Sequence, residues 1–559
     1  MKILVLSLLR LGDALLAADA LDAIRAKNPS AQIDLLVNKG VERVVSFLPA
    51  VHRVYAIDRE LLQQGLVRSD RPIFESLDRL KSLVDRLNSE KYDTIINLTQ
   101  TKFSGYIAAA VEANEKLGMV INHRGQASFG SPWFRYLNDV MGAGAQLGFH
   151  YSDIFKFGSV CDLELNFTRA TPVETKKGKE ELEEWLRFHS FKGGPKILLQ
   201  IFTSDAKKNW PSSAWIKALE TIKLNLPDSQ FIVLGAPNEK RRLEKFQSVA
   251  QANHIQIDLA AMSLEGVFSL LQVADVIVTG DTSIKHLANL TPTRIVEIAV
   301  GSADISRTGA YKNGSLLISS RESCAPCPHS SPCHRDHHAC AAKIDAQAVG
   351  LAISKFIQKD WMSLKVLARE YSDTMRFTKA STDLGGFWLP VDLDTDIIEG
   401  QVASYFDRVA WRFLLNRQHE QILGAYGTES VRFKNWIETA TDQSSIEERL
   451  LPNIDVIEKS TRERESRLER AISEMNHKIR FASEINSMDF IGDELAEELS
   501  QLESDLKLGH FLSENLKLRP DLGLYRVRRL QGSLSEALAQ QKIKLKLLRT
   551  FRQIALEPI

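Results

Sequence analysis

The sequence predicts an α/β protein with two consecutive Rossmann-like domains, followed by an α-helical C-terminal domain. Short apolar runs alternate with helical patterns from the N-terminus, and the alternation restarts after the breaker Gly193-Gly194-Pro195. From about residue 360, strand-like runs nearly vanish and charged helical patterns take over. Buried strands separated by helices are typical of doubly wound parallel sheets. We therefore expect domains at 1–175, 176–358 and 359–559.

The predicted elements of the first domain follow one another in order. Apolar runs predict strands over Lys2–Leu8, Gln32–Val37, Val51–Ile57, Thr94–Leu98 and Leu117–Ile121. Helical patterns predict helices over Asp13–Lys27, Ile73–Asn88 and Ser104–Ala113. No GxGxxG fingerprint accompanies them, but the cleft between two such halves is a usual ligand site.

The second domain repeats this order. Strands are expected over Lys196–Ile201, Gln230–Leu234, Ile255–Leu259, Asp275–Thr279 and Thr293–Ile298. Helices are expected over Lys176–His189, Ser212–Leu224, Glu239–Ala252, Leu264–Val273 and Ser283–Leu290. Further along, a 4-3-4-3 spacing of apolar residues from Leu468 to Ala482 favours a core helix of a small bundle over a long coiled coil.

Composition excludes several classes of protein. The 559 residues contain 71 Lys+Arg and 71 Asp+Glu, so a uniformly basic nucleic-acid-binding protein is not expected. Apolar runs are far shorter than the ~20 residues that a membrane-spanning helix needs. The first apolar run loosely imitates a signal peptide, but Arg10 and Asp13 interrupt it. We expect a cytoplasmic, unprocessed chain.

The first motif is Arg10-Leu11-Gly12-Asp13, between the opening strand and the first helix. Ligands of open α/β sheets bind at this end of the strands. Gly12 permits a tight turn, and Asp13 is a candidate general base. The alternative is that Asp13 only stabilises the helix N-terminus. Lys102 follows another strand and either borders the same cleft or is a solvated loop lysine.

The second motif runs from Thr203 to Pro211 and follows the first strand of the second half. Its lysines are placed to reach phosphates across the interdomain cleft. Trp210-Pro211 fixes the start of the next helix. A solvated loop with an aromatic anchor is the alternative.

The third motif, Gly280-Asp281-Thr282-Ser283-Ile284-Lys285-His286, opens a helix. Free backbone amides at a helix N-terminus suit a diphosphate, and the hydroxyls of Thr282 and Ser283 add donors. Simple capping by Asp281 or Thr282 is the alternative.

Together the three motifs resemble glycosyltransferase family 9, the ADP-heptose:lipopolysaccharide heptosyltransferases and their relatives, over about residues 1–350. The resemblance implies the GT-B fold, in which two Rossmann-like domains face one cleft. It also implies inverting transfer of a sugar from a nucleotide donor, usually ADP-heptose, without a catalytic metal.

The resemblance also implies roles for individual residues. Asp13 matches the proposed base, with Arg10 and Gly12 on the acceptor side of the cleft. Donor-binding positions match Lys208, Thr203, Asp281, Thr282 and His286. Lys208 is in addition expected to stabilise the developing charge of the leaving diphosphate.

Two positions depart from the family pattern. Ser283 replaces the usual glycine after Asp-Thr, where it would either crowd the donor phosphates or donate a hydroxyl, and Lys285 replaces a small or apolar residue. A ribose-binding carboxylate is expected at Glu239, the nearest acidic residue to the corresponding loop. Asp392-Leu393-Asp394-Thr395-Asp396 contains DxD patterns of the kind that GT-A enzymes use to bind a metal-nucleotide, but a solvated acidic turn is favoured.

A cysteine cluster, Cys324-x2-Cys327-x5-Cys333-x6-Cys340, is the other strong signal. Four thiols at short spacing in a reducing compartment favour one tetrahedral Zn or Fe ion over disulfides. Unligated loop cysteines are the alternative. The cluster is similar to one in a subset of family 9 that includes the autotransporter heptosyltransferases, where it holds iron. A structural ion is therefore expected, with no role in catalysis.

The last segment is basic. Residues 506–559 contain 11 Lys+Arg and 4 Asp+Glu, and the run from Lys542 to Arg552 combines basic with apolar residues. Such a run either lies on the inner face of the cytoplasmic membrane, docks a protein partner, or forms a bundle helix with snorkelling lysines.

The sequence thus favours transfer of a heptose from ADP-heptose to a lipopolysaccharide or other cell-envelope polysaccharide. Two other hypotheses stay open. The cysteine cluster suggests protein O-heptosylation, and the departures at Ser283 and Lys285 suggest a sugar-nucleotide-binding scaffold without catalysis.

Overall fold

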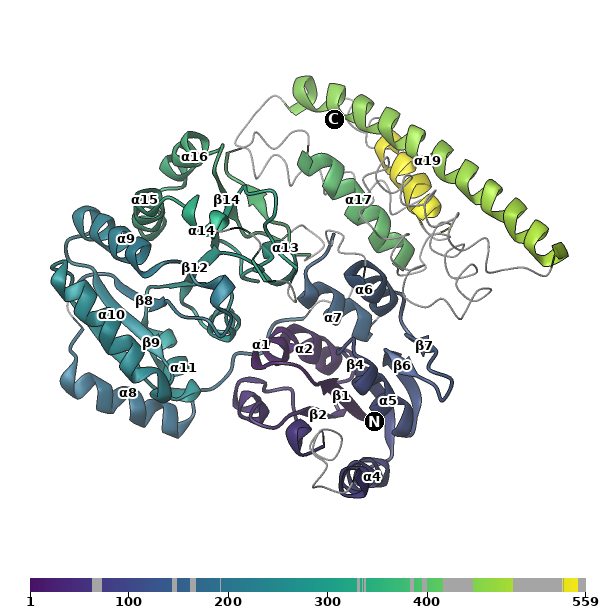
Figure 1. Ribbon diagram of the computed structural model, residues 1–559, viewed down its shortest axis with the longest axis horizontal. Coiled ribbons are helices and arrows are strands. Elements are labelled where there is room, and N and C mark those ends of the chain that lie inside the picture. The colour runs from purple at the N-terminus through teal and green to yellow at the C-terminus, as the bar shows by residue number, and fades with distance from the viewer. Residues whose placement is uncertain are drawn as a thin grey trace.

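The structure is a computed structural model of the whole 559-residue chain (Figure 1). It describes residues 1–62, 73–142, 148–160, 167–191, 193–328, 332–333, 335, 338–382, 387–394, 400–415, 446–485, 535 and 537–550.

The first domain is built on a five-stranded parallel sheet in the order β3-β2-β1-β4-β5. Its strands are β1 (Lys2–Ser7), β2 (Gln32–Asn38), β3 (Arg53–Ile57), β4 (Tyr92–Asn97) and β5 (Ala113–Gly118). A small hairpin of β6 (Val120–Ile121) and β7 (Ala127–Ser128) follows. Alternate residues of β1 enter different cores, because Ile3 and Val5 face one cluster while Leu4 and Leu6 face another. Both faces of the sheet are therefore covered, which explains why the strands read as continuous apolar runs.

The helices of this domain flank the sheet. They are α1 (Leu11–Leu16), α2 (Ala18–Lys27), α4 (Ile73–Ser89), α5 (Lys102–Ala110), α6 (Pro132–Gly142) and α7 (Tyr151–Val160), with a 3-10 turn at Glu42–Phe47. Helices α2 and α7 pack against each other.

Two predicted elements of this domain are divided in the structure. The predicted helix over Asp13–Lys27 becomes α1 and α2, because Ala17 takes ψ −8° and tightens the turn between them. The predicted strand over Leu117–Ile121 is divided at Gly118, which has a φ of +86°. A Cβ atom there would lie 2.0 Å from the Asn97 carbonyl oxygen, so this bend requires glycine.

The second domain has an eight-stranded sheet in the order β10-β9-β8-β11-β12-β13-β14-β15. Its strands are β8 (Lys196–Gln200), β9 (Gln230–Gly235), β10 (Ile257–Ala261), β11 (Val276–Thr279), β12 (Arg294–Ala299), β13 (Leu316–Ser320), β14 (Met375–Lys379) and β15 (Val391–Asp392). The first six are parallel, and β14 and β15 are antiparallel additions at one edge. This sheet therefore extends beyond residue 358, where we expected the domain to end. The alternation of buried Met375 and Phe377 with the less buried Arg376 is a weak strand signal.

Helices cover both faces of the second sheet as well (Figure 1). They are α8 (Lys176–Phe188), α9 (Ser212–Asn225), α10 (Lys240–Ala252), α11 (Leu264–Val273), α12 (Ser283–Ala288), α13 (Ile305–Thr308), α14 (Ala339–Ala342), α15 (Ala346–Ile357) and α16 (Trp361–Glu370). Short 3-10 turns lie at Ala206–Lys208 and Pro237–Glu239.

The rest of the described chain is helical. Helix α17 (Gly400–Leu415) contacts α6, α19 spans Ile446–Ile485, and residues 537–550 form a further helix beside them (Figure 1). Leu468, the first residue of the predicted apolar seam, is fully buried. None of the helices that the structure describes has the length and hydropathy of a membrane span.

Helix α7 connects the first domain to the second through buried polar contacts. His150 Nε2 lies 3.0 Å from the Gly309 carbonyl oxygen. The Asp153 carboxylate accepts hydrogen bonds from the Tyr311 hydroxyl and, at 2.9 Å, from the Trp388 backbone N–H. One apolar core also includes residues of both domains, such as Leu16 and Leu287. The predicted two-domain α/β architecture is thus confirmed.

Candidate active site

The three motifs meet where the two domains touch. Each follows the carboxyl end of a central strand, namely β1, β8 and β11. Helices α1 and α12 lie against each other, and a Cβ atom on Gly12 would lie 3.1 Å from His286 Cδ2. The absence of a side chain at Gly12 therefore allows the two domains to approach closely at this point.

A buried ion network forms the centre of this junction. Lys208 Nζ donates to Asp281 Oδ2 at 2.5 Å, and Lys285 Nζ donates to Asp281 Oδ1 at 2.7 Å. Lys285 Nζ also donates to Glu297 Oε1 at 2.7 Å. Asp281 is thus held between two lysines of the second domain. Lys208 comes from the 3-10 turn Ala206–Lys208, and Lys285 comes from α12.

The charges in this network are coupled. Burial acts to raise the pKa of Asp281, but Lys285 and Lys208 hold it well below its ordinary value. Burial acts to lower the pKa of Lys285, yet the carboxylates of Asp281 and Glu297 raise it above its ordinary value. Asp281 is therefore an anion and Lys285 a cation at neutral pH.

Asp13 lies at the edge of the same network. Burial raises its pKa, the charge of Asp281 adds to this, and the Arg10 N–H and the charge of Lys208 oppose it. Its Oδ2 accepts a hydrogen bond from the Arg10 backbone N–H at 2.9 Å, which fixes the carboxyl group. A carboxylate with a raised pKa is a stronger base than an exposed aspartate.

His286 is buried beside the network and neutral. Burial and the charge of Lys285 lower its pKa well below the ordinary value. Its Nε2 lies 3.9 Å from Asp281 Oδ1, and no described residue hydrogen-bonds its Nδ1. His286 thus has one ring nitrogen, Nδ1, without a hydrogen-bond partner among the described residues.

The helix that follows Asp281 is shorter than predicted. It ends at Ala288 rather than at Leu290, so it has six residues and a correspondingly small dipole. The Thr282 side chain caps it by accepting from the Lys285 backbone N–H at 3.4 Å. Ser283 is partly buried, and its Cα lies 3.7 Å from the Cβ position of Gly12. Lys208 is consequently the stronger candidate for holding phosphate charge.

Two predicted donor-side residues have local partners. The Thr203 hydroxyl donates to the Asp205 carbonyl oxygen at 2.6 Å, and the Thr203 methyl group faces Gly280. Glu239 Oε2 accepts from the Ala236 N–H at 2.9 Å in the turn after β9. Both residues lie at the carboxyl edge of the sheet, and each stabilises its own loop through this hydrogen bond.

Two residues predicted on the acceptor side are exposed. Arg10 precedes α1, and Lys102 is the first residue of α5, which follows β4 beside β1. Among the residues that the structure describes, neither side chain forms an ion pair with the network around Asp281.

The four cysteines of the predicted metal cluster are free thiols that lie near one another. Burial raises the pKa of Cys327, and the neighbouring thiols of Cys340, Cys324 and Cys333 raise it further. Four neighbouring cysteine sulfurs are a donor set that fits a thiolate-bound ion. Within the described part of the chain, however, no three candidate ligands converge in the geometry of a metal site.

Two residues of the network were not predicted as site residues. Lys285 was recognised only as a departure from the family pattern. Glu297 is an acidic residue inside the otherwise apolar strand Arg294–Ala299, and that isolated charge was the available signal. An ionisable residue in a buried strand needs a partner, which is here Lys285.

Two other charged segments have structural partners. Thr378 Oγ1 donates to Asp392 at 2.7 Å, and Arg321 pairs with Asp394, so the described part of the DxD segment braces the edge of the sheet. In the basic C-terminal helix, Lys544 is 2% exposed and its Nζ lies 2.8 Å from Asp407 Oδ1.

The apolar side chains of this C-terminal helix, Leu545, Leu547 and Leu548, are buried as well. A helix that lies on a membrane surface would expose these apolar side chains to the lipid. For residues 537–550 the bundle helix is therefore the correct interpretation, and residues 551–559 lie outside the described part.

Two Rossmann-like domains that meet at the carboxyl edges of their sheets define the GT-B architecture. Residues 80–336 match the model of glycosyltransferase family 9 (heptosyltransferase). Over that range the chain is therefore similar to glycosyltransferase family 9. The matched range includes Lys208 and Asp281, whereas Asp13 precedes it.

Individual relatives are distant. Lipopolysaccharide heptosyltransferase 3 of Escherichia coli K12 is 24% identical over 113 residues, which are 20% of this chain and 30% of that protein. A second Escherichia coli lipopolysaccharide heptosyltransferase 3 is 20% identical over 291 residues, which are 51% of this chain and 80% of that protein. The solved structure of Escherichia coli ADP-heptose lipopolysaccharide heptosyltransferase II is 16% identical with a TM-score of 0.46, over 64% of this chain and 99% of that chain.

Proposed function

We propose that this protein is an inverting heptosyltransferase that moves a heptose from ADP-heptose to a polysaccharide or lipopolysaccharide of the cell envelope. The match to the family model and the heptosyltransferase relatives support the substrate class. The observation that carries the proposal is the buried junction at which Asp13 of one domain meets Lys208 and Asp281 of the other.

The proposed chemistry uses these groups in turn. Asp13 takes the proton of an acceptor hydroxyl as that oxygen attacks the anomeric carbon of the donor. The bond between that carbon and the diphosphate breaks, and ADP leaves with the electron pair. Lys208 exchanges Asp281 for the donor diphosphate and stabilises the charge that develops there. Attack opposite the leaving group inverts the anomeric centre.

A prediction concerns Lys208. In Lys208→Ala, ADP affinity should fall about tenfold and transfer should slow, because a charge-assisted hydrogen bond to phosphate is lost. Calorimetric titration with ADP measures the binding part. Lys207→Ala, one position earlier in the same turn, is the matched control and should bind ADP normally. Unchanged affinity and rate in Lys208→Ala would remove it from the donor site.

A protein acceptor is the second candidate, because the cysteine cluster is similar to that of autotransporter heptosyltransferases. The two candidates differ only in the molecule that gains the sugar. Mass spectrometry of both the glycan and the protein fractions of an envelope extract separates them. A third candidate, a scaffold that binds sugar nucleotide without turnover, requires ADP binding with no product in either fraction.

We also propose a structural Zn or Fe ion bound by Cys324, Cys327, Cys333 and Cys340. The proximity of the four thiols, which is close enough for Cys327 and Cys340 to sense the charges of Cys324 and Cys333, supports it. Four protein ligands leave no position for a substrate, so we assign this ion no step in catalysis.

Elemental analysis tests the ion directly. The purified protein should carry about one ion per chain, and Cys324→Ser/Cys327→Ser should carry almost none and melt at a lower temperature. Equally low metal in both proteins would show that the cysteines bind no metal ion. An unchanged melting temperature after complete metal removal would contradict the structural role.

A further inference from the structure

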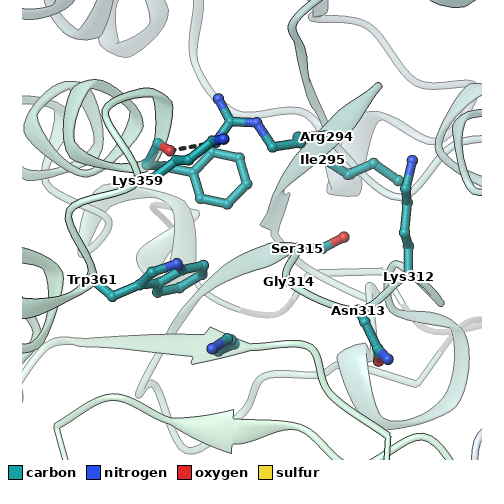
Figure 2. Close-up of a pocket in the computed structure, with 10 residues that line it drawn as sticks. Arg294, Ile295, Lys312, Asn313, Gly314, Ser315, Lys359 and Trp361 are labelled. Carbon is teal, nitrogen blue, oxygen red and sulfur yellow. Dashed lines mark hydrogen bonds between the residues drawn. The ribbon is translucent and has the colours of Figure 1, made fainter. Parts of the chain in front are cut away.

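A cavity lies at the opposite edge of the second sheet from the proposed donor site. It has a volume of about 260 Å³ (Figure 2). Arg294 begins β12, Ser315 directly precedes β13, and Lys379 ends the antiparallel β14, paired with Leu316. These positions are the amino edge of the parallel strands. The proposed donor site lies at their carboxyl edge, so the cavity is a separate site.

The lining of this cavity is cationic. Arg294, Lys312, Lys359 and Lys379 contribute to it, and no acidic residue is among the described residues that line it. Asp275, which acts on Arg294 at longer range, is itself paired with Lys196 Nζ at 3.0 Å. Four positively charged side chains thus line the cavity, and none of its described lining residues is negatively charged.

Three of these cations are held in place by neighbouring groups, whereas Lys359 is exposed. Arg294 donates to the carbonyl oxygens of Phe356 at 2.7 Å and Ile357 at 3.1 Å. Lys312 Nζ donates to the Thr293 carbonyl oxygen at 2.7 Å, and Lys379 Nζ lies 4.6 Å from the centre of the Trp361 ring. Burial, with a smaller contribution from the charge of Arg169, lowers the pKa of Lys312 to about 8.

The hydroxyl group of Ser315 points to a ligand independently of the charges. Its side chain is 2% exposed, and its hydroxyl has no hydrogen-bond partner among the described residues. A buried hydroxyl without a partner costs about 1–3 kcal/mol. Figure 2 shows this hydroxyl between Trp361 on one side and Lys312 on the other. A ligand oxygen in the cavity would satisfy it.

We propose that this cavity binds a small phosphate-bearing anion, with Lys312 and Lys379 as charge partners and Ser315 as a hydrogen-bond donor. The anion is a free inorganic phosphate species or the phosphate group of a sugar phosphate, and both present the same oxygens. Trp361 offers the apolar wall against which a sugar ring packs.

Calorimetric titration with pyrophosphate and, separately, with glucose 1-phosphate tests the proposal on the full chain. Lys379→Met should weaken binding of the preferred probe about tenfold, because one charge partner is lost. Lys245→Met removes the same charge from α10, which packs on β9 and β10 at the far end of the sheet, and should bind normally. Lys208→Ala should also retain this binding, which separates the cavity from the proposed donor site.

Ser315→Ala separates a ligand site from a merely structural residue. Without anion its melting temperature should equal or exceed that of the wild type, because an unsatisfied hydroxyl is removed. With anion it should show a smaller rise in melting temperature than the wild type.

A preference for pyrophosphate would identify an inorganic ligand, and a preference for glucose 1-phosphate a sugar phosphate. Binding of neither probe below about 1 mM, or binding lost only in Lys208→Ala, would overturn the proposal.

Discussion

Asp13→Asn should lower turnover by roughly 10²–10⁴-fold while leaving ADP affinity nearly unchanged. The amide keeps the size of the carboxylate, and its oxygen can still accept the Arg10 N–H that fixes the wild-type side chain. What it loses is the ability to take a proton from the acceptor. The measurement is the rate of sugar transfer at saturating donor, with ADP affinity determined in parallel.

The pH dependence of the wild type gives this prediction a second readout. A base acts only when deprotonated, so kcat/KM should rise with pH through the pKa of Asp13. Burial raises that pKa, and the rise should therefore lie above the ordinary aspartate value of about 3.9. Asp85→Asn, on the exposed face of α4 and paired with Lys81, is the control and should keep wild-type turnover. Near-wild-type turnover of Asp13→Asn would exclude Asp13 as the base.

Lys285→Met should lower the free energy of unfolding by about 3–5 kcal/mol, because it leaves a fully buried carboxylate without its cation. Lys285 is 0% exposed and bridges Asp281 and Glu297, and Glu297 is 1% exposed. Chemical denaturation of the purified variant measures the effect.

The double variant Lys285→Met/Glu297→Gln distinguishes charge from packing. The glutamine can still accept the Ala310 N–H that Glu297 accepts at 2.8 Å, and no buried charge remains at that position. It should regain most of the lost stability. In both variants Asp281 retains only Lys208 as its lysine partner, so Lys208 should release it less readily and donor affinity should fall. Equal destabilisation of the single and double variants would show that packing, and not the unpaired charge, is responsible.

Most of the architecture could be predicted because buried parallel strands have a simple pattern. The runs at Lys2–Ser7 and Gln230–Gly235 are apolar on both faces and are bounded by helices, so their type and order are readable. Strand β14 was missed because Met375–Lys379 is a short strand within a helix-rich segment. Such a strand depends on pairing with β13, which no local pattern specifies.

The candidate site was predictable only in part. Motif order placed Asp13, Lys208 and Asp281 at strand ends, and parallel strands bring such ends together. The roles of Lys285 and Glu297 could not be read locally, because their pairing depends on the packing of α12 against β12. The ion pairs of the basic C-terminal helix could not be read locally either. Its lysines pair with Asp407 and Glu469, which are distant in the sequence.

Mass spectrometry of the products formed from ADP-heptose and a cell-envelope extract tests the central claim most directly. The wild type should release ADP and add one heptose to an acceptor, and Asp13→Asn should do neither at a comparable rate. An acceptor modified equally by both proteins, or wild-type protein that binds ADP yet transfers no sugar from any nucleotide donor offered, would contradict the assignment of this junction as a heptosyltransferase active site.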